Sequence, residues 1–189
     1  YYSKRSPSIL TAYNIFNYEP EWVKNASIPH PEYLFTQSDK YFYVSTGNGD
    51  IFGFGIEGEV VFQTNALENF VPEVFHVFDT RLVAEQVSRN GLERFLIIYY
   101  LETGNEQNRL KINNDVVDIN SSQGEALIFL NHGLDGVVTS LDPEEFVYTE
   151  QQRLKDINIL SVTRIDDRSF LVVTSEGIFE YDHYLKAFS

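Results

Sequence analysis

The sequence predicts an all-β fold built from repeated antiparallel units of three to four strands. Two observations carry this prediction: segments of similar pattern recur along the chain, and glycine or asparagine turn signals separate short apolar runs. The aromatic content, 15 Phe and 12 Tyr, agrees with it because large aromatic side chains suit a pleated, half-buried surface. At 189 residues the chain is long enough to bury a core without a disulfide or a metal.

The clearest repeat joins residues 39–62 and residues 167–188. Each segment begins with Asp and a basic residue, continues as an apolar strand that ends in Thr, turns at Gly, resumes with Ile-Phe and closes with a third strand. The glycines at 47, 49 and 177 stand where such turns require positive φ. The matched positions are Thr46 with Thr174, Ile51-Phe52 with Ile178-Phe179, and Phe62 with Phe188.

Two looser units, residues 92–112 and 124–148, lie between the matched pair. An apolar stretch precedes each of the four units and predicts an additional inner strand. These stretches are residues 33–35, 74–78, 116–119 and 157–165. Upstream, residues 9–28 predict the last two strands of a preceding unit. The repeats recur every roughly 30 to 55 residues, a range that includes the spacing of propeller blades.

With this pattern the chain resembles β-propeller repeats of the broad WD40-like or quinoprotein-like kind over residues 9–188, without a signature of any particular family. The resemblance implies short-stranded blades, of which about four are visible. A β-trefoil, with three repeats of four strands, is the alternative. Because a closed ring has four to eight blades and the leading half-unit has no counterpart at the C-terminus, we expect residues 1–189 to be one β-repeat domain and a portion of a larger propeller.

Two segments are harder to assign. Residues 82–101 could form one helix, but Asn90-Gly91 in the middle is a strong hairpin turn signal, so we predict a hairpin. In residues 142–155, Asp142 at an N-cap and Pro143 after it would suit a helix. The apolar residues there bunch at 146–148 and leave a poor helical face. A helix and a strand with a polar loop both remain open for this segment.

The amino-acid composition restricts the classes of partner that the chain can bind. The chain carries 14 basic and 28 acidic residues, a formal charge of −14, so it lacks the basic footprint that nucleic-acid binding requires. No apolar run reaches the length of a membrane helix, so we expect no membrane insertion. Cysteine is absent, which excludes disulfides and thiolate sites. The missing Met and the start at Tyr1 predict a processed or excised piece, and together with the Cys-free, Tyr- and Asn-rich composition they favour an extracytoplasmic location.

No motif predicts a catalytic, cofactor or metal site. Gly47-Asn48-Gly49-Asp50 lacks the Lys-Ser/Thr pair and the helix of a phosphate loop and predicts a hairpin turn. The four histidines lack zinc-ligand spacing, so we expect turn or surface positions for them. The aromatic stripes predict core and inter-blade packing, with exposed Tyr or Trp22 as the alternative hot spot. The histidines are His30, His76, His132 and His183, and the stripes are residues 41–43 and 95–100.

The sequence therefore favours a non-enzymatic scaffold that presents propeller loops to a protein partner or to the remainder of the same propeller. The alternative is an extracellular carbohydrate-binding or glycoside-processing propeller with a site in the central channel. The two functions require different structural features. The enzyme requires titratable groups that converge in a pocket, whereas the scaffold requires an exposed apolar patch or a free sheet edge. No individual binding residue can be ranked from the sequence.

Overall fold

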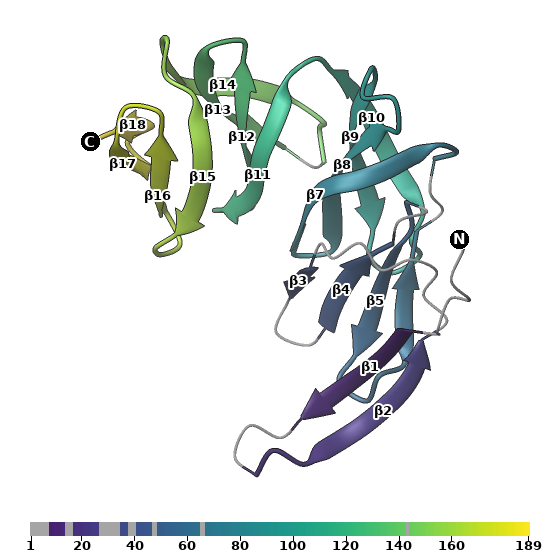
Figure 1. Cartoon of the computed structure of the whole chain (residues 1–189). Helices are drawn as coiled ribbons and strands as arrows, with labels where there is room; N and C mark the ends of the chain where they lie inside the picture. The colour runs from purple at the N-terminus through teal and green to yellow at the C-terminus, as the bar shows by residue number, and fades with distance from the viewer. Residues whose placement is uncertain are drawn as a thin grey trace, which may run out of the picture.

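The computed structural model describes residues 8–13, 17–26, 35–37, 41–46, 49–64, 67–142 and 144–189 (Figure 1). Every regular element in these ranges is a β-strand, which confirms the all-β prediction. Within them no helix has the length and apolar character needed to span a lipid bilayer. Some residues that the sequence predictions included lie outside the described residues, namely 33–34, His30, Gly47, Asn48 and Pro143.

Sixteen of the strands form four antiparallel sheets of four strands, here called blades 1 to 4. In each blade the strands pair in sequence order, so consecutive strands are neighbours. Blade 1 contains β3 (Phe35–Gln37), β4 (Tyr41–Ser45), β5 (Ile51–Gly55) and β6 (Val60–Gln63). Blade 2 contains β7 (Phe70–Phe78), β8 (Arg81–Ser88), β9 (Arg94–Tyr100) and β10 (Glu106–Ile112). Blade 3 contains β11 (Asp115–Ser122), β12 (Glu125–His132), β13 (Asp135–Leu141) and β14 (Tyr148–Leu154). Blade 4 contains β15 (Ile159–Arg164), β16 (Ser169–Thr174), β17 (Ile178–Asp182) and β18 (Ala187–Phe188).

The blades follow one another along an open arc, with the hairpin of β1 (Ser8–Tyr13) and β2 (Pro20–Ala26) at one end and blade 4 at the other (Figure 1). The first strands of neighbouring blades contact each other, β3 with β7, β7 with β11 and β11 with β15, so they line the inner side of the arc. The chain forms four consecutive four-stranded meanders, whereas a β-trefoil consists of three repeats of four strands. The β-trefoil alternative is therefore wrong.

The hydrophobic core lies between blades, because alternate residues of a strand point to opposite faces of its sheet. Three apolar clusters fill the three junctions between neighbouring blades. Tyr43, Ile51, Phe62, Leu82 and Tyr99 are buried between blades 1 and 2. Val83, Leu96, Ile98, Ile119 and Ile128 are buried between blades 2 and 3. Leu127, Phe129, Phe170, Val172 and Tyr181 are buried between blades 3 and 4. The aromatic stripes thus supply inter-blade packing at Tyr43 and Tyr99, as predicted.

Both ambiguous segments are strands. Residues 82–101 form the predicted hairpin, in which β8 pairs with β9 and Gly91 has a φ of 73°. Residues 142–155 are a turn followed by β14, so the helix alternative is wrong there. The Asp142 carboxylate does accept hydrogen bonds from the backbone N–H groups of Glu144 (2.8 Å) and Glu145 (3.0 Å). This is the capping geometry the sequence suggested, but the chain turns instead of continuing as a helix, and β14 returns to pair with β13.

Candidate binding face

One end of the blades carries the turns that join first to second strands and third to fourth strands. Because strands in a meander alternate in direction, these turns share one end of each sheet. We call this end the turn face. Contacts between turns of different blades hold it together: Arg81 after the β7–β8 turn pairs with Glu144 of the β13–β14 turn at 2.6 Å. Ser122 Oγ of blade 3 donates to the carbonyl of Asp167 in blade 4 at 2.7 Å. The turn face is thus a continuous surface across blades 2 to 4.

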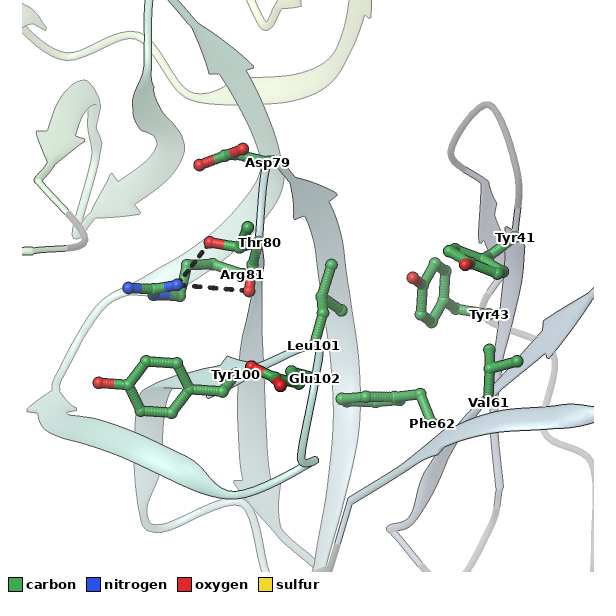
Figure 2. Close-up of a pocket in the computed structure, with 10 residues that line it drawn as sticks. All are labelled: Tyr41, Tyr43, Val61, Phe62, Asp79, Thr80, Arg81, Tyr100, Leu101 and Glu102. Atoms are coloured by element: carbon green, nitrogen blue, oxygen red, sulfur yellow. Dashed lines mark hydrogen bonds between the residues drawn. The ribbon is translucent and has the colours of Figure 1, made fainter.

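A groove of about 550 Å³ opens on the turn face between blades 1 and 2 (Figure 2). We call it the tyrosine groove. Its walls are mainly apolar and aromatic, with polar groups at the strand ends and turns. Blade 1 contributes Tyr41, Tyr43, Val61 and Phe62, and blade 2 contributes Asp79, Thr80, Arg81, Tyr100, Leu101 and Glu102.

The blade 1 wall depends on a close approach of two aromatic rings. Tyr43 is buried and meets Phe62 edge to face with ring centroids 5.7 Å apart. Gly53, on the strand between them, makes this possible, because a Cβ there would lie 2.7 Å from Tyr43 Cε1 and 2.9 Å from Phe62 Cβ. Tyr41 begins the same strand as Tyr43 and is 38% exposed. The wall thus has a fixed aromatic base and an accessible tyrosine at its rim.

The blade 2 end is organised by Arg81, whose side chain is only 11% exposed. Its Nε donates to Gln107 Oε1 at 2.6 Å and its Nη2 to Glu144 Oε1 at 2.6 Å. The guanidinium carbon lies 4.5 Å from the centroid of the Tyr100 ring. These contacts hold Tyr100, itself 38% exposed, in place. In the view of Figure 2, Tyr41 and Tyr43 stand at one end of the groove and Arg81 and Tyr100 at the other.

Two carboxylates, Asp79 and Glu102, line the groove and are exposed. Neither side chain makes a hydrogen bond or an ion pair to another described residue. Many of the other acidic side chains on the turn face do have partners. These are Glu106 with Arg109, Asp142 with backbone N–H groups, Glu144 with Arg81, Asp166 with backbone N–H groups, Asp167 with Arg164, and Asp182 with Arg168.

A second pocket of about 390 Å³ lies on the turn face closer to the inner strands. Asp79 lines both pockets, so they are adjacent. In this pocket Arg164 Nη2 lies 2.8 Å from Asp167 Oδ1. The main charged groups of the pocket thus form an ion pair with each other. The remaining lining is Phe78 and the β11–β12 turn from Ser121 to Gly124.

Of the three histidines in the described residues, His76 alone departs from the turn or surface positions predicted for them. His76 lies within β7, where it is half-buried and its Nε2 is 3.2 Å from Ser121 Oγ of the neighbouring blade. Burial, with a smaller contribution from Arg164, lowers the pKa of His76 to about 4. His183 does lie in a turn but is 5% exposed, and burial lowers its pKa as well. His132 is exposed at the end of β12, as predicted.

Two buried carboxyl groups lie away from both pockets. Burial raises the pKa of Glu85 on β8 to about 7 and that of Asp118 on β11 to about 6. Glu85 is enclosed between blades 2 and 3, where Arg94 Nη1 lies 2.9 Å from its Oε1. Within the described part of the chain, no three His, Asp or Glu side chains come close enough to hold a metal ion.

A further exposed surface is the outer face of blade 4. Paired residues of neighbouring strands share a face, and Leu171 and Val173 pair with Glu180 and Ile178. Leu171 is 38% exposed and Ile178 65%. In blade 3 the face in the same orientation is buried against blade 4 through Leu127 and Phe129. The outer face of blade 4 is therefore exposed to solvent, whereas the equivalent face of blade 3 is covered by blade 4.

Sequence reasoning missed most of the groove. It named Tyr41 and Tyr100 only within stripes assigned to packing, with exposure as the alternative, and their partial exposure supports that alternative for these two residues. It did not name Asp79, Arg81 or Glu102. Their position directly before or after an apolar strand was the available signal, since residues that flank a strand face the turns.

We compared the chain with known protein families, curated proteins and solved structures. No protein-family model matches the sequence, and a search of curated proteins finds no match. Solved structures do match. BamB from Moraxella catarrhalis aligns over 95% of this chain and 57% of its own, with a TM-score of 0.65 and 11% identity. The C-terminal WD40 domain of Sif2 aligns over 95% and 50%, with a TM-score of 0.64 and 17% identity.

The fold is a β-propeller. The dihydro-heme d1 dehydrogenase NirN, solved in complex with DHE, agrees, with a TM-score of 0.68, 11% identity and coverage of 97% of this chain and 41% of its own. The predicted resemblance to propeller repeats is thus confirmed, with about four blades as expected. The chain spans about half the length of these propellers. Sequence identities this low show the fold alone, so the function has to be inferred from the candidate site.

Proposed function

We propose that this propeller is a rigid scaffold that binds a segment of a protein partner in the tyrosine groove. The observation that carries the proposal is the composition of the groove: Tyr41, Tyr100 and Arg81 line one mainly apolar pocket between two blades. Tyrosine and arginine are among the residues most enriched at energetic hot spots of protein interfaces. Short paired strands keep the walls fixed, so a partner would meet a preorganised surface.

The test is a selection of random peptides displayed on phage against the immobilised chain, followed by titration of the recovered peptides. Replacing both Tyr41 and Tyr100 with alanine is expected to weaken their binding at least tenfold, because truncation of hot-spot residues removes about 1–2 kcal/mol or more. The matched control replaces Tyr18 and Tyr184, which are 81% and 70% exposed outside the groove, and should leave binding unchanged. Peptides that bind the groove variant and the parent equally would contradict the proposal.

Carbohydrate binding is the second candidate. It is favoured by the exposed Tyr41 and Tyr100 rings, on which a sugar could stack, and by the nearby carboxylates of Asp79 and Glu102, which could accept hydrogen bonds from hydroxyl groups. Glycoside hydrolysis would further need two carboxyl groups on either side of the scissile bond, one of them with a raised pKa. A glycan array probed with the parent chain and the Tyr41/Tyr100 variant separates this function from peptide binding.

We also infer that the outer face of blade 4 packs against another propeller blade, supplied in solution by a second copy of the chain. The exposed Leu171 and Ile178 support this, as does the length of the matching propellers, roughly twice that of this chain. Light scattering at about 100 μM should show self-association of the parent chain, with a Kd at or below this range. Leu171→Asp with Ile178→Asp should abolish it and leave the circular dichroism unchanged. A parent chain that is monomeric at all concentrations would disprove this contact.

A further inference from the structure

We propose that the outer face of blade 4 packs against the same face of a second copy, so that the chain forms a closed two-fold dimer. This inference rests on the proposed contact between copies and identifies the surface that the second copy supplies. Two properties of the arc carry it. Blade 4 exposes a sheet face that is covered in the preceding blades, and the face of blade 1 at the other end of the arc is already buried.

The outer face of blade 4 follows from the pairing of its strands, because directly paired residues lie on the same side of a sheet. Leu171 and Val173 of β16 supply the centre of this face. Leu171 is 38% exposed, and Ile178 on the neighbouring strand is 65% exposed. The residues that pair with Leu171 and Val173 on this face are Thr163 and Ser161 of β15 and Glu180 and Ile178 of β17.

The equivalent faces of the preceding blades are buried in junctions. Leu127 and Phe129 of β12 are completely buried between blades 3 and 4. Val83 of β8 is completely buried between blades 2 and 3. An apolar face in this orientation is thus covered by another blade wherever one follows. The blade 4 face has the same aliphatic character, so another blade is the surface that suits it.

The other end of the arc, where blade 1 lies beside the β1–β2 hairpin, is different (Figure 1). The face of blade 1 that points away from blade 2 is centred on Val44 and Phe54, which are only 6% and 2% exposed. The Phe42 ring stacks on Phe54 with 5.1 Å between centroids. A head-to-tail contact between blade 4 and this face would have to open existing packing. The blade 4 face of the second copy is already exposed, so it is the surface available for the contact.

Charge on the blade 4 face is confined to its β17 side. The Asp182 carboxylate accepts a hydrogen bond from the N–H of Leu185 at 2.9 Å and lies 3.7 Å from Arg168 Nε. Glu180 is exposed. The β15 and β16 residues of the face are uncharged, so two copies can meet across these strands with their acids at the rim. Two chains of net charge −14 still repel at long range. Association should therefore strengthen when NaCl rises from about 50 to about 300 mM.

The two arrangements of the copies differ in how they grow. A contact between identical faces uses the face of both copies, so association stops at the dimer. A head-to-tail contact leaves a free surface at each end and continues to larger oligomers unless it closes into a ring. A chain whose blade 4 face is disabled also behaves differently, because it can still accept a parent chain in the head-to-tail arrangement but not in the two-fold one.

Labelled copies separate the two arrangements. The chain contains no Cys, so Leu92→Cys, at an exposed turn of blade 2, introduces a single thiol for a fluorescent label. Sedimentation with unlabelled parent chain at about 100 μM should show the labelled parent in dimers and in nothing larger. The labelled chain that also carries Leu171→Asp and Ile178→Asp should bind the parent at least about tenfold more weakly.

Thr163→Cys places the single thiol on the blade 4 face itself. A short bismaleimide should join two Thr163→Cys chains into a covalent dimer and should not join two Leu92→Cys chains. Binding of the labelled Asp variant to the parent, oligomers larger than dimers, or parent dimers without the Thr163→Cys cross-link would overturn the two-fold arrangement while leaving association between copies standing. A parent chain that is monomeric at every concentration and salt level would overturn both.

Discussion

Replacing Phe129 with alanine is expected to lower the free energy of unfolding by about 3–5 kcal/mol. Phe129 is completely buried at the junction of blades 3 and 4. Its ring lies 5.4 Å from that of Phe170 and meets Tyr181 edge to face at 5.9 Å, both centroid distances. Truncation removes the ring from two aromatic pairs and leaves a cavity that two rigid sheets cannot collapse to fill.

Urea unfolding followed by circular dichroism measures this loss. Leu160→Ala is the matched control, because Leu160 lies on β15 of blade 4 and is 61% exposed. It should change stability by less than about 1 kcal/mol. If the two substitutions destabilise the chain equally, the apolar junction between blades 3 and 4 does not carry the stability assigned to it. The comparison therefore tests whether cohesion of the arc resides between blades.

The blades could be predicted from sequence because their signals are local. Asn90-Gly91 predicts a two-strand hairpin without knowledge of the rest of the chain, since only residues that tolerate positive φ suit such a turn. The match of Thr46 with Thr174 also has a local cause. In both turns the threonine hydroxyl accepts a backbone hydrogen bond, from Asp50 at 3.2 Å and from Gly177 at 3.1 Å. Repeated turn chemistry thus produced the repeat that the sequence displays.

The groove could not be predicted because its parts are distant in sequence. Tyr41 of blade 1 lines the same groove as Arg81 and Tyr100 of blade 2 only because the two sheets pack together, and alternation within one strand cannot report that packing. The same limit hid the partners of residues 142–155, where the Asp142 cap favours a helix locally. Pairing of β14 with β13 overrides that preference, since strand pairing and burial contribute more than one cap.

Glu85 illustrates the limit most clearly. It lies in the middle of β8, two residues from Val83 and on the same face, at a position where alternation predicts a buried apolar residue. It is nevertheless a carboxyl group, fully buried, with Oε2 lacking a hydrogen bond. Arg94 on the adjacent strand compensates for this by bonding Glu85 at 2.9 Å and Asp115 of blade 3 at 3.1 Å. The arginine therefore connects two blades through a group that would otherwise be an isolated buried charge.

Replacing Arg94 with leucine is expected to lower the free energy of unfolding by about 3 kcal/mol at pH 8, because it leaves Glu85 charged and unpaired. The pKa of Glu85 is raised by burial to about 7, above its value in the unfolded chain. The folded state therefore binds the extra proton, and the stability linked to it is complete below the unfolded pKa and lost as the pH rises through about 7. Without Arg94 this pKa rises further, so the deficit should be smaller at pH 5.5 than at pH 8.

Urea unfolding of the parent and variant chains at both pH values measures the deficit, and a second substitution identifies its cause. Arg94→Leu with Glu85→Leu removes both charges and fills a position that faces apolar side chains of blade 3. The double variant should recover most of the stability at pH 8 and lose the difference between the two pH values, since replacement of a buried pair by apolar residues is often neutral or stabilising. A double variant as unstable as Arg94→Leu would mean that Arg94 acts through Asp115 and Glu73, its other carboxylate partners, rather than through Glu85.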